Sequence, residues 1–304
     1  MSNYQERFFS KVANLCQRSK HYGEALTEVV QPFVILFIIS TLLCACSSTT
    51  VDKTPQVAEV RLMNSPEIQD SIIQEHVHEG AKKLGLYSLE RQQELDKGLA
   101  KDSTIAYLWQ QKAMPLYKQG KYELGLEYLD KAVRYNPERW QDYRAFMKCI
   151  FAKTYRASII DFEDCRRKYG NNVVMDHSYN FYIAVCKLQL NEFDEAEKLL
   201  VQEVENQAKE NGEEWVHHLD LFYLGITQYE QRKLEEALAT FDRALEKYAT
   251  FSEALQFKAA TLGRLGKMEE ANRIAELARS YGKKGYSFNE DNQAYERYPY
   301  QIRW

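Results

Sequence analysis

The chain has 304 residues, of which 45% are hydrophobic and 13% aromatic. This composition is typical of a globular chain with a sizeable core, and it excludes a chain that is disordered throughout. The formal net charge of −4 at pH 7 gives no electrostatic footprint for nucleic acid, which calls for a clustered basic surface. We therefore expect a folded protein without a nucleic-acid partner.

The N-terminal region contains a short apolar segment, residues 33–45, which ends at the motif LCAC at residues 43–46. The segment is shorter than the roughly 20 residues of a membrane-spanning helix and has the length of a signal-peptide core. The motif resembles the lipobox of bacterial lipoproteins. The resemblance implies that residues 1–45 are a signal peptide and that Cys46 carries the lipid. An uncleaved membrane anchor is the alternative, because the region before the apolar segment is unusually long.

Polar residues 46–64 follow and are expected to form a flexible tether. Ser47 occupies the position where aspartate is the usual inner-membrane retention signal of enteric bacteria, so the resemblance favours the outer membrane. Residues 47–51 contain no acidic cluster of the kind that resembles a surface-export signal. The prediction is a lipoprotein of the bacterial cell envelope, anchored in the outer membrane and facing the periplasm.

The next segment, residues 65–101, is predicted to be a degenerate N-terminal helical cap. Ser65 and Pro66 look like the start of a helix, with a capping residue followed by proline at the first helical position. We expect one helix over residues 66–84 and a second over residues 88–101.

Between residues 102 and 285 a helix-turn-helix pattern recurs, with residues 109–137 as its best-formed copy. A small or polar residue, followed two positions later by an aromatic or apolar one, marks each turn. The turn signals are Gly120-Lys-Tyr122, Asn191-Glu-Phe193, Arg232-Lys-Leu234 and Gly266-Lys-Met268. Small residues three positions after each signal permit close helix packing. A weaker unit over residues 140–170, with Tyr155 at the turn, brings the number of repeats to about five.

This pattern resembles the tetratricopeptide repeat, or TPR. The resemblance implies an all-α fold, a right-handed superhelical α-solenoid in which neighbouring repeats bury one another's apolar faces. The long interval between turn positions 193 and 234 predicts an insertion in the polar stretch 205–214. Lys112 and Lys258 stand where the family usually has leucine, so we expect imperfect packing there.

In TPR proteins the first helices of the repeats line a concave groove, and the resemblance implies the same here. The groove positions of this chain are rich in aromatic residues, which suit an extended peptide or a partner helix. The alternative for each ring is packing against a neighbouring repeat. The predicted partner-binding residues are Tyr107, Gln110, Gln111, Tyr117, Lys118, Tyr182, Phe222, Tyr223, Tyr229, Phe257 and Arg264.

The C-terminal tail, residues 286–304, is rich in tyrosine, asparagine and glutamine. Two interpretations are open. In the first, the tail folds over the exposed face of the last repeat. In the second, it is a tethered ligand of the groove itself.

The histidines give no metal signature by their spacing. His76 and His78 are two apart and point to different faces of a helix, whereas a helical metal pair needs a spacing of three or four. His217 and His218 are adjacent and equally ill placed. We expect packing or surface roles for both pairs and no metal site.

Three cysteines follow the predicted lipidation site, namely Cys149, Cys165 and Cys186. They fit the pattern of small buried hydrophobic residues, with a disulfide between Cys149 and Cys165 as an alternative in an oxidising periplasm. No phosphate-binding loop, nucleophile elbow or zinc motif is visible. We expect no enzyme and no cofactor.

The function predicted from the sequence is a non-enzymatic, lipid-anchored envelope scaffold. It binds another envelope protein or peptide through the aromatic groove, and no small-molecule substrate is evident. The alternatives are an accessory subunit of an envelope transport, secretion or cell-wall assembly machine, an uncleaved membrane-anchored TPR protein, and an enzyme of unrecognised type housed in the insertion or the tail.

Overall fold

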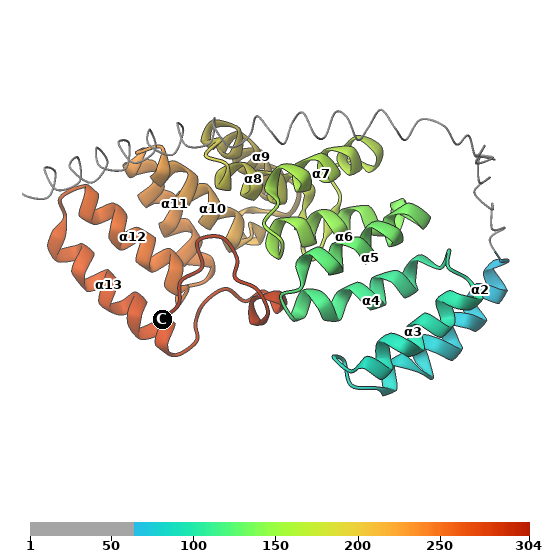
Figure 1. Cartoon of the computed structure of the whole chain (residues 1–304). Helices are drawn as coiled ribbons and strands as arrows, with labels where there is room; N and C mark the ends of the chain where they lie inside the picture. The colour runs from blue at the N-terminus through green and yellow to red at the C-terminus, as the bar shows by residue number, and fades with distance from the viewer. Residues whose placement is uncertain (1–63) are drawn as a thin grey trace, which may run out of the picture. The chain divides into compact units, whose positions relative to one another are not determined.

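The computed structural model describes residues 64–304, so the predicted signal peptide, Cys46 and the tether up to residue 63 lie outside the described residues. From residue 64 onward the chain forms twelve α-helices, α2–α13 (Figure 1). Ten of them pack as consecutive pairs, which confirms the all-α solenoid. The pairs are α4 (Ala106–Lys118) with α5 (Tyr122–Tyr135), α6 (Pro137–Ile150) with α7 (Tyr155–Tyr169), α8 (Tyr179–Gln189) with α9 (Phe193–Asn211), α10 (His218–Glu230) with α11 (Leu234–Lys247), and α12 (Ser252–Arg264) with α13 (Met268–Lys283).

Each pair turns at a residue with left-handed backbone conformation, and the second helix begins two residues later. Glycine and asparagine adopt this conformation at little cost, which is why they are good turn signals. The signals found in the sequence therefore coincide with the helix starts. The left-handed residues are Gly120 (φ 73°), Lys153 (φ 56°), Asn191 (φ 61°), Arg232 (φ 63°) and Gly266 (φ 79°).

Small residues let the two helices of a pair approach closely. A Cβ atom added at Gly125 would lie 2.9 Å from the ring of Tyr117, and one at Gly225 would lie 2.6 Å from the ring of Phe241. Both separations are below the contact distance of about 3.5 Å between carbon atoms. Any larger residue at these two positions would force the helices apart.

The second pair, α6 and α7, accounts for the weak repeat in the sequence. Ser158 and Phe162 are fully buried, and the Ser158 hydroxyl donates a 2.7 Å hydrogen bond to the carbonyl of Ala145. The neighbouring Phe146 takes the place that a small residue has in the first helix of the other pairs, and its ring is also fully buried. A phenylalanine at this position hides the repeat from a pattern built on alanine and glycine.

A longer helix accounts for the predicted insertion. α9 extends to Asn211 and is followed by a 3₁₀ turn, η3 (Glu213–Trp215). The polar stretch 205–214 thus forms the last turns of α9 and the beginning of η3.

A β-hairpin that the sequence did not predict precedes α8. Its strands β1 (Val173–Val174) and β2 (His177–Ser178) pair antiparallel, with Val174 opposite His177. Met175 and Asp176 between them have φ of 47° and 71°, as a type I′ turn requires. Because the first turn position is methionine rather than asparagine, aspartate or glycine, and the second is aspartate rather than glycine, the turn carries no recognisable signal.

The helices before α4 have a small core of their own, which includes Val77 and Leu95. The expected helix over residues 66–84 is shorter, because α2 (Pro66–Ile73) continues only as a π-helical turn, η1 (Gln74–His78), and then breaks at Gly80. A Cβ at Gly80 would lie 2.7 Å from the side chain of Glu94 on the next helix. A 3₁₀ turn, η2 (Ala81–Lys83), and α3 (Leu89–Lys101) complete this region.

Among the helices of residues 64–304, none has both the length and the apolar character needed to cross a membrane.

Candidate functional site: the inner surface of the repeats and the C-terminal tail

The C-terminal tail, residues 286–304, lies along the first helices of the repeats, and the surface that it contacts on α4, α10 and α12 is here called the inner surface. The tail leaves α13, runs to the first repeat and returns, as the red loop of Figure 1 shows. At its far end Glu296 is bonded to Tyr122 on α5 and lies 2.7 Å from the ammonium group of Lys153. At its near end the ring of Trp304 packs on Gly282 of α13, where a Cβ atom would overlap it. The tail thus spans the inner surface twice, as in the second interpretation, and its end packs on the last repeat, as in the first.

Aromatic packing holds the outgoing limb of the tail. Phe288 is buried, and its ring centroid lies 5.5 Å from that of Phe222, 6.2 Å from that of Tyr223 and 5.4 Å from that of Phe251. Tyr298 of the returning limb is buried as well and lies 5.8 Å from Phe288. Burying an aromatic side chain of this size contributes about 1.5–3 kcal/mol. The two rings are therefore the main apolar anchors of the tail.

A buried carboxylate joins the two limbs of the tail. Glu253, at the start of α12, is fully buried and accepts hydrogen bonds from the Ser287 hydroxyl at 2.7 Å and from the backbone N–H of Ile302 at 3.3 Å. The Tyr223 hydroxyl donates a 3.0 Å bond to the carbonyl of Pro299. Burial raises the pKa of Tyr223 well above its usual value, so this hydroxyl stays a donor. Such bonds require a particular backbone register of the tail.

Charge and aromatic contacts fix the tip of the tail on the first repeat. The ammonium group of Lys118 lies 4.0 Å from the ring centroid of Tyr295, within the range of a cation–π interaction. Burial and the hydrogen bond to Glu296 raise the pKa of Tyr122 to about 12. The tip therefore places the carboxylate of Glu296 between the phenol of Tyr122 and the ammonium group of Lys153.

Four of the eleven predicted partner-binding residues touch the tail. Lys118, Phe222 and Tyr223 do so as described, and the ring of Phe257 lies 5.7 Å from that of Tyr300. Phe222 and Tyr223 are fully buried, and both contact the tail, so in this structure they are packed rather than open to a partner. The sequence did not single out Phe288 or Glu253, although the aromatic richness of the tail was a visible signal.

The other predicted residues pack within and between the repeats and the cap and do not converge. Tyr107 stacks on Trp140 with ring centroids 6.2 Å apart, and Gln111 accepts a 2.9 Å bond from Arg91 of the cap while donating to Gln110. Their physical role is to join neighbouring helix pairs. The remaining three contacts are Tyr117 buried against Phe151, Tyr182 buried against Phe162, and the guanidinium of Arg264 3.7 Å from the ring of Tyr229.

His217 and His218, whose spacing shows no metal signature, meet a third histidine in the structure. His177 of the hairpin has its ring centroid 5.0 Å from that of His217, which in turn is 4.4 Å from that of His218. Burial, followed by the nearby histidines, lowers the pKa of His217 to about 3, and burial lowers that of His218 to about 4. Burial raises the pKa of Asp220 to about 6. His217 and His218 therefore stay neutral, and Nδ1 of His217 lies 3.8 Å from Oδ2 of the buried Asp220.

The three described cysteines are free and buried. The Cys149 thiol is hydrogen-bonded to Cys186, and burial raises its pKa well above the usual value. The alternative of a disulfide between Cys149 and Cys165 is not realised in this structure. A thiol that stays protonated is a poor nucleophile, which fits the role of a small apolar residue.

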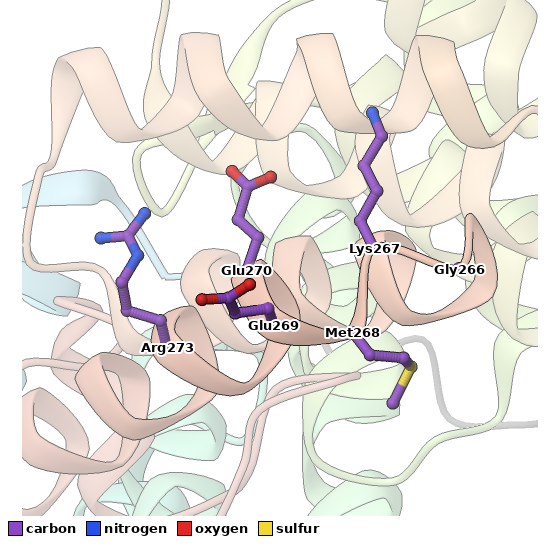
Figure 2. A pocket seen from close by; sticks show the side chains of 6 residues that line it. All are labelled: Gly266, Lys267, Met268, Glu269, Glu270 and Arg273. Carbon is purple, nitrogen blue, oxygen red and sulfur yellow. The ribbon is translucent and has the colours of Figure 1, made fainter.

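A wide pocket of about 660 Å³ opens at the turn between α12 and α13. Figure 2 shows that Lys267 and Met268 point in opposite directions from this turn. A binding site needs polar groups that converge on one point. This pocket is therefore a surface depression beside the first turn of the last helix.

No protein-family model matches the sequence, and no curated protein matches it. Solved structures do resemble its fold. A tetratricopeptide repeat protein from Parabacteroides merdae gives a TM-score of 0.57 at 13% identity, covering 71% of this chain and 80% of its own. PilW, a type IV pilus biogenesis factor, gives a TM-score of 0.49 at 13% identity, covering 75% of this chain and 92% of its own. YrrB, a TPR protein with an unusual peptide-binding site, gives a TM-score of 0.45 at 17% identity, covering 62% of this chain and 92% of its own. At such identities the likeness is one of fold, and residues 64–304 have the fold of a tetratricopeptide repeat solenoid.

Proposed function

We propose that this chain is a non-enzymatic scaffold of the bacterial envelope, which binds another envelope protein or peptide on the inner surface of its repeats. The observation that carries the proposal is the tail, because an aromatic segment of the chain itself, which includes the 3₁₀ turn η4 (Asp291–Ala294), already occupies that surface. Extended segments bind solenoid surfaces through side-chain pockets and main-chain hydrogen bonds. The tail uses both kinds of contact.

In this proposal the tail is a tethered occupant that a partner displaces. The contacts of the tail define the chemistry of the partner segment: an aromatic ring in the place of Phe288, a carboxylate facing Lys153 and a main-chain carbonyl for the hydroxyl of Tyr223. A short tether gives an effective concentration in the millimolar range. A partner therefore needs either high local concentration or contacts beyond those of the tail.

Photo-crosslinking from the inner surface tests this proposal. A photoreactive amino acid replaces Lys118, beneath the tail tip, in the full chain, with and without Gly282→Ala, which displaces Trp304 and loosens the tail. We expect a crosslinked envelope protein that becomes more abundant with Gly282→Ala and is competed by a synthetic peptide of residues 286–304. The control is the same group at Glu127, which is exposed on the second helix of the first repeat.

Identical products from positions 118 and 127, or no product from position 118 with either tail, would contradict the groove as a binding surface. The identity of the crosslinked protein separates a free-standing scaffold from an accessory subunit of a transport, secretion or cell-wall assembly machine. In the second case the product contains a component of that machine.

We further propose that lipid on Cys46 holds the scaffold at the outer membrane, facing the periplasm. The support is the lipobox-like motif at residues 43–46. Each buried methylene of an acyl chain adds about 0.8 kcal/mol, so several chains anchor a protein firmly. Cys46→Ala is expected to abolish labelling with radioactive palmitate and to release the chain from outer-membrane fractions. Cys44→Ala, two residues away, serves as the control and keeps both. Unchanged fractionation of Cys46→Ala would favour the uncleaved anchor.

A further inference from the structure

Three side chains with metal-binding chemistry meet where the β-hairpin packs on the start of α10. His177 lies on β2, His217 directly precedes α10, and Asp220 lies in the first turn of that helix. One ligand atom from each residue lies within 4.8 Å of the other two. Two imidazoles and a carboxylate form a common ligand set of zinc sites that keep a fourth position open.

The two ligands on α10 are already close to metal-binding geometry. Nδ1 of His217 and Oδ2 of Asp220 are 3.8 Å apart, too far for a hydrogen bond. Two ligands of a tetrahedral zinc ion with bonds of about 2.0 Å lie about 3.3 Å apart. Nδ1 of His217 accepts the backbone N–H of Leu219 at 3.3 Å and is therefore unprotonated, and a metal ion on Nδ1 would take the place of this long hydrogen bond. The two atoms would have to approach each other by about 0.5 Å to hold one zinc ion.

The surrounding cavity favours a cation. It has a volume of about 470 Å³, and none of the residues that line it is lysine or arginine. Its carboxylates are Asp176, Glu203, Glu210 and Asp220. The positive end of the α10 dipole disfavours a cation by about 0.3–1 kcal/mol, and four acidic side chains outweigh it. The same cavity gives solvent access to the fourth position of a bound ion.

A carboxylate of the tail orients the third ligand. Nε2 of His177 donates a 3.1 Å hydrogen bond to Oε1 of Glu290, and both side chains are buried. Histidine ligands commonly donate their second ring N–H to a carboxylate, which fixes the tautomer and the ring orientation. With the proton on Nε2, the lone pair of His177 is on Nδ1. The tail and the histidine cluster thus share one bond.

We propose that His177, His217 and Asp220 bind a divalent transition-metal ion, Zn²⁺ before others, and that Glu290 is a positioning residue for His177. Because the tail supplies Glu290, metal binding and tail docking strengthen each other by the same factor. The site needs no partner on the inner surface, so it stands or falls independently of the proposed scaffold function.

Isothermal titration with Zn²⁺ tests the site on the full chain in detergent, after removal of metal with a chelator. We expect one ion per chain for the wild type and for His78→Gln, an exposed histidine outside the cluster. Asp220→Asn, which is nearly isosteric, and His217→Gln should each bind at least about 100-fold more weakly, because each loses a ligand. Glu290→Gln should bind about 10–100-fold more weakly, the range for a residue that orients a ligand.

Circular dichroism of each variant establishes that the helices persist. If His217→Gln fails to fold, the zinc affinity of Asp220→Asn alone tests the site. A wild-type chain that takes up no stoichiometric Zn²⁺ overturns the site, as does wild-type affinity in Asp220→Asn. Wild-type affinity in Glu290→Gln overturns the positioning role and leaves the three ligands in place.

Discussion

The two helices of the fourth repeat, α10 and α11, bury their side chains in different ways. In α10 every residue from His218 to Gln228 is buried, whereas α11 buries only Ala237, Thr240, Phe241 and Ala244. α11 has neighbours on one side and presents a single apolar stripe to them. α10 packs against α9 and α11 and also meets the tail. The tail therefore turns the inner surface from an exposed groove into part of the core.

This difference has a consequence for binding. An exposed aromatic surface of several hundred Å² is rare on a soluble protein and marks an interaction site or an aggregation hazard. The tail removes the hazard by covering Phe222 and Tyr223. In the proposed function, a partner that replaces the tail must cover the same rings, so the stability of the docked tail would set the affinity of that partner.

The largest expected effect comes from removing the tail. A chain that ends at residue 285 loses the buried rings of Phe288 and Tyr298, worth about 3–6 kcal/mol together, and exposes the rings beneath them. We expect the free energy of unfolding, measured by urea denaturation, to fall by about 3 kcal/mol or more. A chain with a scrambled tail of the same composition is the control and should lose as much. Unchanged stability would mean that the inner surface is no part of the core.

A pH change should act on α10 through His218. The pKa of His218 is lowered by burial from 6.5 to about 4, and its Nε2 contacts Oδ1 of Asn289 in the tail at 3.1 Å. Below pH 6.5 the unfolded chain takes up a proton that the folded chain refuses until about pH 4. The stability from this group is therefore present above pH 6.5 and is lost as the pH falls to 4, by at most about 3 kcal/mol.

Urea denaturation of the wild type and of His218→Gln between pH 7 and pH 4, with a chelator present, measures this contribution. The difference between the two proteins isolates His218, because Asp220, whose raised pKa of about 6 works in the opposite sense, is common to both. A pH-independent difference would show that the imidazole is not held neutral against the tail.

A glycine on α13 distinguishes tail docking from helix propensity. Gly282→Ala places a methyl group in the ring of Trp304 and is expected to cost about 1–3 kcal/mol, as overpacking does. Gly263→Ala, on α12, meets nothing within 4 Å and should stabilise the chain by up to about 1 kcal/mol. Thermal unfolding followed by circular dichroism checks both. Equal effects of the two changes would mean that Trp304 is not docked at position 282.

The helix pairs could be predicted from the sequence because their signals are local. A left-handed residue such as Gly120 or Asn191, an aromatic residue two positions later and a small residue three beyond it act within a single turn and its two helices. The path of the tail could not be predicted from the sequence, because it depends on contacts such as that between Tyr122 and Glu296, which are 174 residues apart. The aromatic composition of residues 286–304 indicated a segment that packs on another surface, but only the long-range contacts determine where it lies.

The candidate site was predictable only in part for the same reason. The sequence placed Phe222 and Tyr223 on the inner surface, but their burial depends on the tail. His177 reaches His217 only through the hairpin, whose Met175-Asp176 turn lacks the usual residues. Spacing along one helix is the wrong test for ligands that come from two elements.

The smallest expected effect concerns Lys112 on α4, where the family usually has leucine. The buried stem of Lys112 carries its ammonium group to Asp96 of the cap, 2.5 Å away. Asp96 is more than half exposed, so water screens the pair and its net contribution is below about 1 kcal/mol. Lys112→Leu replaces the ion pair by apolar contact and should change the free energy of unfolding by less than about 1 kcal/mol in either direction.

Asp96→Ala, which leaves the lysine buried without its partner, should cost more than Lys112→Leu. If both changes cost several kcal/mol, the cap depends on this ion pair; if Asp96→Ala costs nothing, the ammonium group is already hydrated and the cap is held by its apolar core.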